Sequence, residues 1–192
     1  MTRFVLCLLA IAIVSSTVSA AEPKEKAQPE KTVAVEKQAP DFKIKDSSGK
    51  LINLSELTSK GPVLVRLTCG CSGCDKELAY FQALHEAYKG QGFTSIAIFR
   101  EPDKKVEEYV KKKQLKMLYA VDTKGESWKV FQTKTMPTNF LIEKGGRIKS
   151  IVDGCDPSGL VANILSEKVA GLLGTKTVNV QAAGKQQTVK KD

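Results

Sequence analysis

Three cysteines lie within one six-residue stretch, Cys69-Gly70-Cys71-Ser72-Gly73-Cys74. Cys71 and Cys74 are three residues apart, which is about one turn at the start of a helix, so their sulfurs can reach each other. A thiol at a helix start faces unpaired backbone N–H groups and the positive end of the helix dipole, and both favour the thiolate. The thiolate is the nucleophile in disulfide exchange. The spacing therefore predicts that Cys71 attacks a substrate disulfide and that Cys74 resolves the mixed disulfide.

An inert structural cross-link is the alternative interpretation of the same pair. A disulfide that closes so small a ring removes little entropy from the unfolded chain, and it therefore stabilises the fold little. The strand-to-helix context of the motif, more than its spacing, favours redox chemistry over a structural role.

A strand and a helix have to hold this motif. Residues 62–68 form a short run of branched and aliphatic side chains, which predicts a strand buried on both faces. Residues 72–89 predict a helix that ends at Gly90. Its apolar stripe has helical spacing and consists of Leu78, Phe81, Leu84 and Tyr88.

Further elements alternate along the chain. The sequence predicts a second buried strand, an amphipathic helix, two strands of a hairpin and a closing helix with a proline in its first turn. These elements occupy residues 93–99, 104–114, 138–142, 147–151 and 157–173. This order predicts an α/β sandwich.

The first twenty residues have the layout of a secretory signal peptide. Arg3 gives a positive start, residues 4–14 are an unbroken apolar run, and Val18-Ser19-Ala20 supplies small residues before a cleavage site at Ala21. The run is too short to span a bilayer. We therefore expect an exported protein, periplasmic or extracellular, with no integral membrane segment in the mature chain.

The remaining chain divides by composition. Residues 21–38 are rich in Glu, Lys and Pro and predict a charged, disordered tether. Residues 39–174 are the expected domain, and residues 175–192, with four lysines and one aspartate, are expected to be a flexible basic tail. The net charge of +9 does not predict nucleic-acid binding, because no aromatic residues are interleaved with the lysines at 111–113.

Residues 39–173 resemble the thioredoxin superfamily, and within it the exported redoxins known as TlpA-like thiol–disulfide oxidoreductases. The resemblance covers nearly the whole expected domain, in the family's order and spacing. Besides the cysteine motif, the segments that carry it are Ala39-Pro40-Asp41-Phe42, Ser48-Gly49-Lys50, Leu54-Ser55-Glu56-Leu57, Gly61-Pro62-Val63-Leu64-Val65, Gly90-Gln91-Gly92-Phe93, Met136-Pro137-Thr138-Asn139-Phe140-Leu141-Ile142 and Gly145-Gly146-Arg147-Ile148. The resemblance implies a thioredoxin-like α/β fold, with a central mixed β-sheet flanked by helices and an N-terminal redoxin-type extension.

The resemblance also implies roles for three residues outside the cysteine motif. Pro137 matches the family's cis-proline, which faces the motif and lets the backbone of Met136 pair with a bound peptide. Glu77 matches an acidic position that moves protons near the thiols, although an ordinary first-turn helix acid is an equal alternative. The implied partners are cysteine-containing exported proteins, apocytochromes among them, and a membrane thiol electron donor, with no cofactor.

Three positions depart from the family pattern. Gly70 stands where the family usually has a tryptophan, and Ser72-Gly73 replaces a motif that commonly contains proline. Arg66 lies close to the position at which thioredoxins keep a buried acid. These departures leave exchange possible, but they do not allow its potential, rate or substrate to be inferred from the family. The direction of exchange depends on the reduction potential, which no residue here fixes.

Two further cysteines admit several interpretations. The implied fold puts Cys69 and Cys155 at the same edge of the sheet, so we expect them to pair or to pass a disulfide to Cys71; the alternative is two unrelated small apolar residues. In a second class of function, Cys69, Cys71 and Cys74 bind zinc or copper(I), together with Cys155 or His85. Against a metal site, the sequence has no second closely spaced cysteine pair.

A peroxidase of the peroxiredoxin type is a third interpretation. Thr68 precedes Cys71 by three residues as in those enzymes, but Leu64 and Asn139 replace their characteristic proline and arginine. A protein-interaction module that has lost turnover is a fourth, and the presence of both motif cysteines argues against it.

Overall fold

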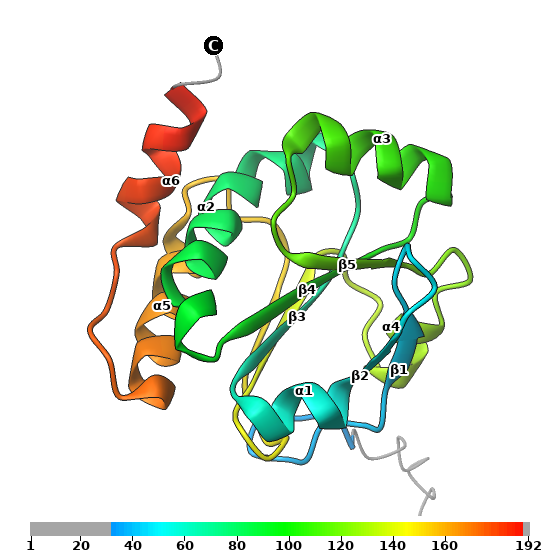
Figure 1. The fold of residues 1–192 in the computed structure, drawn as a ribbon, viewed down its shortest axis with the longest axis horizontal. Coiled ribbons are helices and arrows are strands. Elements are labelled where there is room, and N and C mark those ends of the chain that lie inside the picture. Colours follow the sequence, from blue (N-terminus) through cyan, green and yellow to red (C-terminus); the bar gives the residue numbers. More distant parts are fainter. Residues whose placement is uncertain (1–31, 190–192) are drawn as a thin grey trace, which may run out of the picture. The chain divides into compact units, whose positions relative to one another are not determined.

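A five-stranded mixed sheet forms the centre of the protein (Figure 1). The computed structural model describes residues 32–189. The strands lie in the order β5-β4-β3-β6-β7, with β3, β4 and β5 parallel and with β6 and β7 antiparallel to their neighbours. Their bounds are Val63–Thr68 for β3, Thr94–Phe99 for β4, Leu118–Val121 for β5, Thr138–Ile142 for β6 and Ile148–Asp153 for β7. The expected α/β fold with a central mixed sheet is confirmed.

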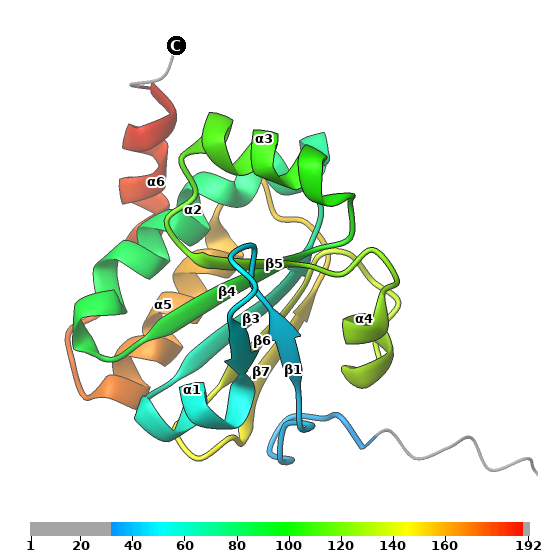
Figure 2. The ribbon, with the colours of Figure 1, turned by 45° about the vertical axis from the view of Figure 1, so that its right-hand side comes forward.

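Helices cover one face of this sheet. Leu64 of β3 packs there against α2 and α5, and Ala97 and Phe99 of β4 pack against α3. Figures 1 and 2 show α2, α5 and α6 (Val180–Val189) together on one side of the strands. The bounds are Ser72–Tyr88 for α2, Asp103–Lys113 for α3 and Leu160–Leu173 for α5. The helix predicted for residues 72–89 therefore ends one residue earlier than expected.

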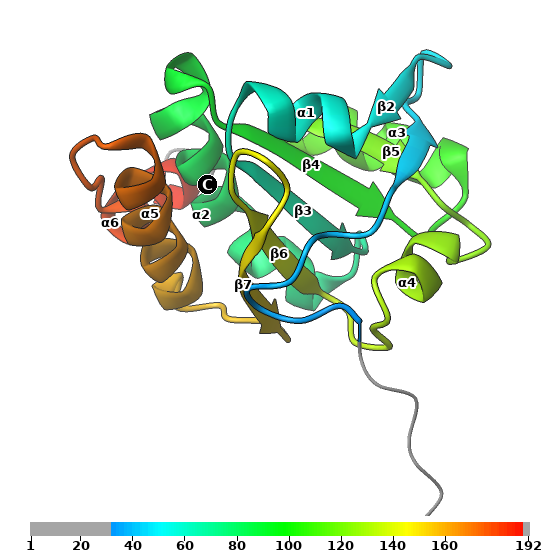
Figure 3. The ribbon, with the colours of Figure 1, turned by 90° about the horizontal axis from the view of Figure 1, so that it is seen from below.

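The opposite face is covered by the N-terminal segment and a short helix. Val65 and Leu67 of β3 belong to this second core, together with Phe42 and Phe131. Phe42 and Phe131 contact each other edge-to-face, with their ring centroids 5.3 Å apart. The elements on this side, seen from below in Figure 3, are β1 (Lys43–Lys45), β2 (Leu51–Asn53), α1 (Leu54–Lys60) and α4 (Glu126–Val130).

The folded unit begins earlier than residue 39. The part of the expected tether that the structure describes, residues 32–38, runs beside β7: Glu36 N–H donates to the Ile148 carbonyl (2.8 Å), and Ile148 N–H donates to the Lys37 carbonyl (2.9 Å). Val33 is buried in the second core. These bonds pair backbone groups of an edge strand, which a composition-based prediction does not detect. The predicted signal peptide and residues 21–31 lie outside the described residues.

The prediction of a flexible tail is wrong for residues 175–189. Helix α6 (Val180–Val189) packs against α2, and Val180 is fully buried. Tyr88 ties the connecting segment to α5, because its hydroxyl accepts from Val178 N–H (2.9 Å) and bonds the Ser166 hydroxyl (2.8 Å). Gly184 allows the close approach, since a Cβ there would lie 2.3 Å from the Tyr80 ring. Tertiary packing thus forms a helix that periodicity does not indicate.

A smaller difference concerns the start of helix α5. Helix α5 starts at Leu160 and not at 157, because Asp156 and Gly159 form a turn before it (Gly159 N to Asp156 O, 3.2 Å). Among residues 32–189, no helix combines the length and hydropathy needed to cross a membrane.

Candidate active site

The cysteine motif lies where β3 ends and α2 begins. Cys71 is the N-cap residue of α2, with extended backbone angles (φ −76°, ψ 162°), and its carbonyl accepts from Asp75 N–H at 3.0 Å. Cys71 is exposed, whereas the Cys74 side chain is only 2% exposed. The predicted strand-to-helix placement is therefore correct, and only the first motif sulfur is open to a large substrate.

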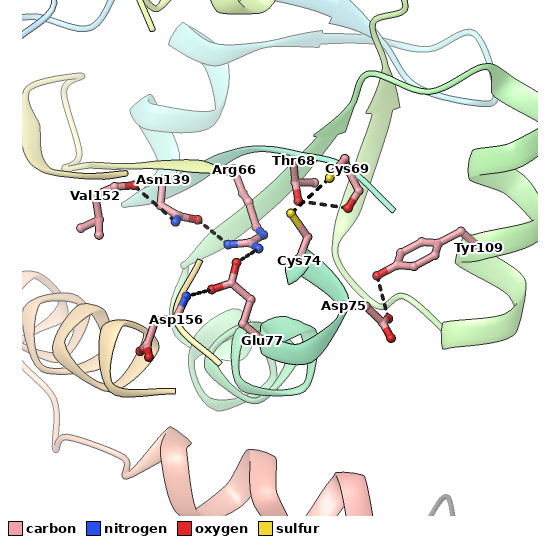
Figure 4. A network of polar contacts seen from close by, with 10 residues as sticks. All are labelled: Arg66, Thr68, Cys69, Cys74, Asp75, Glu77, Tyr109, Asn139, Val152 and Asp156. Atoms are coloured by element: carbon pink, nitrogen blue, oxygen red, sulfur yellow. Dashed lines mark hydrogen bonds and ion pairs between the residues drawn. The ribbon is translucent and has the colours of Figure 1, made fainter. Parts of the chain in front are cut away.

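Three sulfurs gather at this helix start. The Sγ atoms of Cys69, Cys71 and Cys74 all lie within 4.8 Å of one another. The Cys69 and Cys74 sulfurs are 3.3 Å apart, and Figure 4 shows the Cys74 side chain directed toward Cys69. All three residues are free thiols. Within this stretch, the buried thiol of Cys74 therefore has two neighbouring thiols with which it can form a disulfide.

The surroundings of Cys71 favour its thiolate. A hydrogen bond from the Cys69 thiol is the largest cause that lowers the pKa of Cys71, and the N–H groups of Cys74 and Gly73 lower it further. Burial acts in the opposite direction on Cys69 and raises the pKa of that thiol. At a given pH, a larger fraction of Cys71 than of Cys69 is therefore present as the thiolate, which is the nucleophilic form.

We expect the rate of Cys71 alkylation by iodoacetamide to rise with pH, with a midpoint below 9.0, the ordinary value for a cysteine. A lowered pKa means that the reactive thiolate is present at lower pH. Cys69→Ala should move the midpoint upward, because it removes the largest stabilising hydrogen bond. Mass spectrometry of the tryptic peptide 67–76 measures the rate, and Cys155, whose pKa is raised to about 11, serves as an internal comparison. An unchanged midpoint in Cys69→Ala would contradict the assignment.

The fourth cysteine approaches the motif from the loop after β7. A Cβ added at Gly73 would lie 3.2 Å from the Cys155 Sγ, so this sulfur sits directly over the turn between the motif cysteines. Cys155 Sγ also lies within 4.8 Å of Cys74 Sγ and of a Glu77 carboxylate oxygen. Desolvation raises the pKa of Cys155 to about 11.

The expected proximity of Cys69 and Cys155 takes a different form. Each lies beside Cys74, but the two do not share a group of mutually close donor atoms in the described part of the chain. The topology argument places both at the correct edge of the sheet. It does not specify that the buried Cys74 side chain lies next to each of them.

A buried ion pair lies directly behind the motif. Arg66 of β3 (2% exposed) donates to Glu77 of α2 (1% exposed) and, at 2.8 Å, to the Asn139 side chain on β6. The second Glu77 oxygen accepts from Asp156 N–H at 2.8 Å, and the Arg66 guanidinium stacks 4.0 Å from the Phe81 ring centroid. The carboxylate thus connects β3, α2 and the loop that carries Cys155 (Figure 4).

Sequence reasoning identifies Glu77 but not this network. The available signal is an arginine in the middle of an otherwise apolar buried strand, which requires a buried acidic partner. Arg66 and Asn139 face each other across the β3–β6 ladder, which brings residues 73 positions apart into contact. This pairing becomes visible only when the strand order is known.

Three contacts fix the outer side of the motif. Gly70 N–H donates to a Glu101 carboxylate oxygen at 2.6 Å, which holds the loop before Cys71. Asp75, in the first turn of α2, accepts from the Tyr109 hydroxyl (3.1 Å) and from Lys113 Nζ (2.7 Å) of α3. The loop and the helix start are therefore anchored to elements on the β4 side of the sheet.

The Met136–Pro137 peptide bond is cis. Leu67 lies opposite Thr138 in the β3–β6 ladder, so Pro137 comes at the level where β3 ends and the motif loop begins. The Pro137 carbonyl accepts from Gly154 N–H at 2.8 Å, and Gly154 directly precedes Cys155. The topology thus brings the predicted substrate-side residues to the same sheet edge as the cysteines.

Two sets of donor atoms have the proximity that a metal ion requires. One consists of Cys69, Cys71 and Cys74, and the other of Cys74, Glu77 and Cys155. Both Glu77 oxygens already have partners in Arg66 and Asp156, so the second set is the poorer one. His85, which was considered as a ligand from the sequence, belongs to neither set.

The chain is similar in sequence and in fold to proteins that are already known. The model of the AhpC/TSA family matches residues 35–151. The thiol-disulfide oxidoreductase ResA of Geobacillus thermodenitrificans is 31% identical over 153 residues, covering 79% of this chain and 86% of the relative. ResA of Bacillus thuringiensis subsp. konkukian is 35% identical over 126 residues, covering 65% and 73%. A structure assigned as the thiol:disulfide interchange protein DsbE of Chlorobium tepidum superposes with a TM-score of 0.68 at 23% identity, covering 74% of this chain and 99% of that one.

Proposed function

Since the chain belongs to the AhpC/TSA family and to its thiol–disulfide oxidoreductases, we propose that it exchanges disulfides with exported proteins through Cys71 and Cys74. The observation that carries the proposal is the placement of these two thiols. An exposed Cys71 caps α2, and a buried Cys74 lies one turn further on with its sulfur within 4.8 Å. This arrangement suits a nucleophile that meets the substrate and a second thiol that the substrate does not reach.

In the reducing direction, the Cys71 thiolate attacks one sulfur of a substrate disulfide. A Cys71–substrate bond forms, the substrate disulfide breaks, and the other substrate sulfur leaves as a thiolate. The Cys74 thiolate then attacks Cys71 Sγ, forms the Cys71–Cys74 disulfide and releases the second substrate thiol. Two electrons have passed to the substrate, and an external dithiol donor must return them to the enzyme.

The proposed substrate platform is the segment at Met136 and Pro137. The cis peptide bond and the β3–β6 register support this role, because they put the segment at the edge where the motif lies. An extended peptide that pairs with the Met136 backbone would then present its cysteine to Cys71.

Glu77 stays in the proposed site in a positioning role. Both of its oxygens are engaged, by Arg66 and by Asp156 N–H, so the carboxylate holds a fixed negative charge beside Cys74 and Cys155. Its charge is one cause of the raised pKa of Cys155. Proton transfer by Glu77 would require that one of these two bonds open.

Export and the identity of the partners are part of the proposal. The charged start, the apolar run and the small residues of positions 1–20 support a cleavable signal peptide. The partners would be cysteine-containing exported proteins, with a membrane thiol carrier as the electron donor. A fusion of residues 1–38 to a reporter enzyme that is active only outside the cytoplasm tests export, and an inactive fusion would refute it.

A redox titration against defined thiol buffers tests the exchange function. We expect an internal disulfide that includes Cys74 to form and break reversibly at a potential of roughly −270 to −120 mV, the range of dithiol oxidoreductases. The state of each cysteine is read by trapping free thiols and by mass spectrometry. If Cys74 forms no reversible disulfide at any potential, the proposed function fails and metal binding by the same thiols becomes the leading alternative.

A further inference from the structure

We infer that Cys74 has a second disulfide partner in Cys69, so that the oxidised enzyme can hold a Cys69–Cys74 disulfide and present Cys71 as a free thiol. The inference rests on the proposed function, because it needs a reversible disulfide at Cys74. It adds a third redox thiol to the two that the CxxC spacing indicates.

The first support is the position of the sulfurs. Cys74 Sγ lies 3.3 Å from Cys69 Sγ, and Cys71 Sγ completes a group whose members are all within 4.8 Å. Cys69 directly follows β3, whose residues are all buried, and the next residue, Gly70, is held by Glu101. Cys69 is thus kept next to Cys74 by the fold, and pairing requires only that the two sulfurs approach further.

The second support is accessibility. Cys74 is buried, Cys69 is partly buried and Cys71 is exposed. A Cys69–Cys74 disulfide would lie inside the site, away from reductants that cannot enter it. Cys71 would stay at the surface at the start of α2, still hydrogen-bonded by backbone N–H groups that lower its pKa.

The exchange step balances without an external reagent. Cys69 loses its proton to solvent as its sulfur attacks Cys74 Sγ in the Cys71–Cys74 disulfide. The Cys69–Cys74 bond forms, the Cys71–Cys74 bond breaks, and Cys71 leaves as a thiolate. One disulfide and one thiol are present before and after the step, so nothing is oxidised or reduced overall.

The direction of this step follows from the difference between the attacking thiol, Cys69, and the leaving thiol, Cys71. A thiol of lower pKa is the better leaving group in disulfide exchange. Burial raises the pKa of Cys69. The pKa of Cys71 is lowered chiefly by the Cys69 thiol, which the new disulfide removes, and also by the N–H groups of Cys74 and Gly73, which remain. Cys71 is therefore displaced more readily than Cys69. We therefore expect the internal disulfide to collect at Cys69–Cys74.

The consequence is a different kind of reaction. Cys71 is free while the internal disulfide persists, so its thiolate can attack a substrate disulfide and form a mixed disulfide with the substrate. Another thiol of the substrate can then attack this mixed disulfide and release Cys71. Such a cycle rearranges substrate disulfides without consuming electrons. The substrate class is then exported proteins with more than one cysteine.

A serine substitution at the nucleophile provides the sharpest test. Cys71→Ser in a Cys155→Ser background leaves only Cys69 and Cys74 in the mature chain. We expect this double variant, oxidised by diamide at low protein concentration, to become a monomer lacking two hydrogens in its mass. The matched control adds Cys69→Ser and should stay at the reduced mass. Free thiols in the oxidised double variant would overturn the inference.

The same question can be answered in the unmodified enzyme. After oxidation, free thiols are blocked with N-ethylmaleimide, the disulfides are reduced, and the released thiols are labelled with iodoacetamide. Fragmentation of peptide 67–76 should locate the maleimide on Cys71. Maleimide on Cys69 instead would show a Cys71–Cys74 disulfide, which refutes the inference and leaves the proposed function intact. Maleimide on all three cysteines would refute both.

Discussion

Cys71→Ser should reduce disulfide exchange by a factor of at least about 10³, because it removes the atom that forms the covalent intermediate. The hydroxyl of serine is not appreciably ionised at neutral pH and cannot replace the thiolate that the start of α2 favours. Reduction of a disulfide-bonded model protein by dithiothreitol, followed by turbidity, measures the rate. Ser59→Ala, at an exposed position of α1 on the sheet face opposite to α2, is the control and should leave the rate unchanged.

Cys74→Ser should have a different signature. Attack by Cys71 remains, but resolution by the buried second thiol is lost, so a mixed disulfide with the substrate accumulates. The adduct is visible on a non-reducing gel and disappears on reduction. Equal steady-state turnover in Cys71→Ser and in the unmodified enzyme would contradict the assignment of the nucleophile. Failure of Cys74→Ser to trap any adduct would contradict the resolving role.

Arg66→Met should lower the free energy of unfolding by about 3–5 kcal/mol. The substitution leaves the Glu77 carboxylate buried without its cation, in a site where both partners are almost completely inaccessible. Asn139 also loses its hydrogen-bond donor. Urea denaturation followed by circular dichroism gives the midpoint and slope from which this change is obtained.

The double variant Arg66→Met/Glu77→Met separates the charge effect from packing. Replacing a buried pair by apolar residues of similar volume often costs little, so the double variant should be more stable than Arg66→Met alone. If the double variant instead loses as much free energy of unfolding as Arg66→Met and Glu77→Met lose in sum, the two side chains of the ion pair have no coupling energy. Asp156 N–H loses its acceptor in the double variant, so some destabilisation should remain.

The chemistry of the motif is predictable because it is local. A buried strand, a CxxC spacing and an amphipathic helix are contiguous, and together they determine that Cys71 caps a helix and that Cys74 lies one turn away. The side-chain rotamer of Cys74 is a tertiary property. It depends on what else is packed at the sheet edge, and for this reason its 3.3 Å contact with the Cys69 sulfur could not be identified from spacing.

The parts that sequence reasoning misses depend on contacts between distant segments. The partners of Arg66 come from α2 and β6, and their convergence requires the strand order β3-β6. Helix α6 has no strong periodicity; the Tyr80 ring on α2 lies against its Gly184, and the Tyr88 hydroxyl holds the segment before it at Val178. Composition alone describes such a segment as loose, because it does not contain the surface against which the segment packs.

The glycine at position 73 limits how this enzyme can be engineered. Proline is common inside the motif of the family that the chain resembles, but here it would act on two neighbours at once. It would remove the Gly73 N–H, which is one of the donors to Cys71, and its Cβ would lie 3.2 Å from the Cys155 sulfur, closer than an ordinary contact. A proline at position 73 therefore has to be introduced together with a smaller residue at 155. Variant libraries that keep Cys155 should select against it.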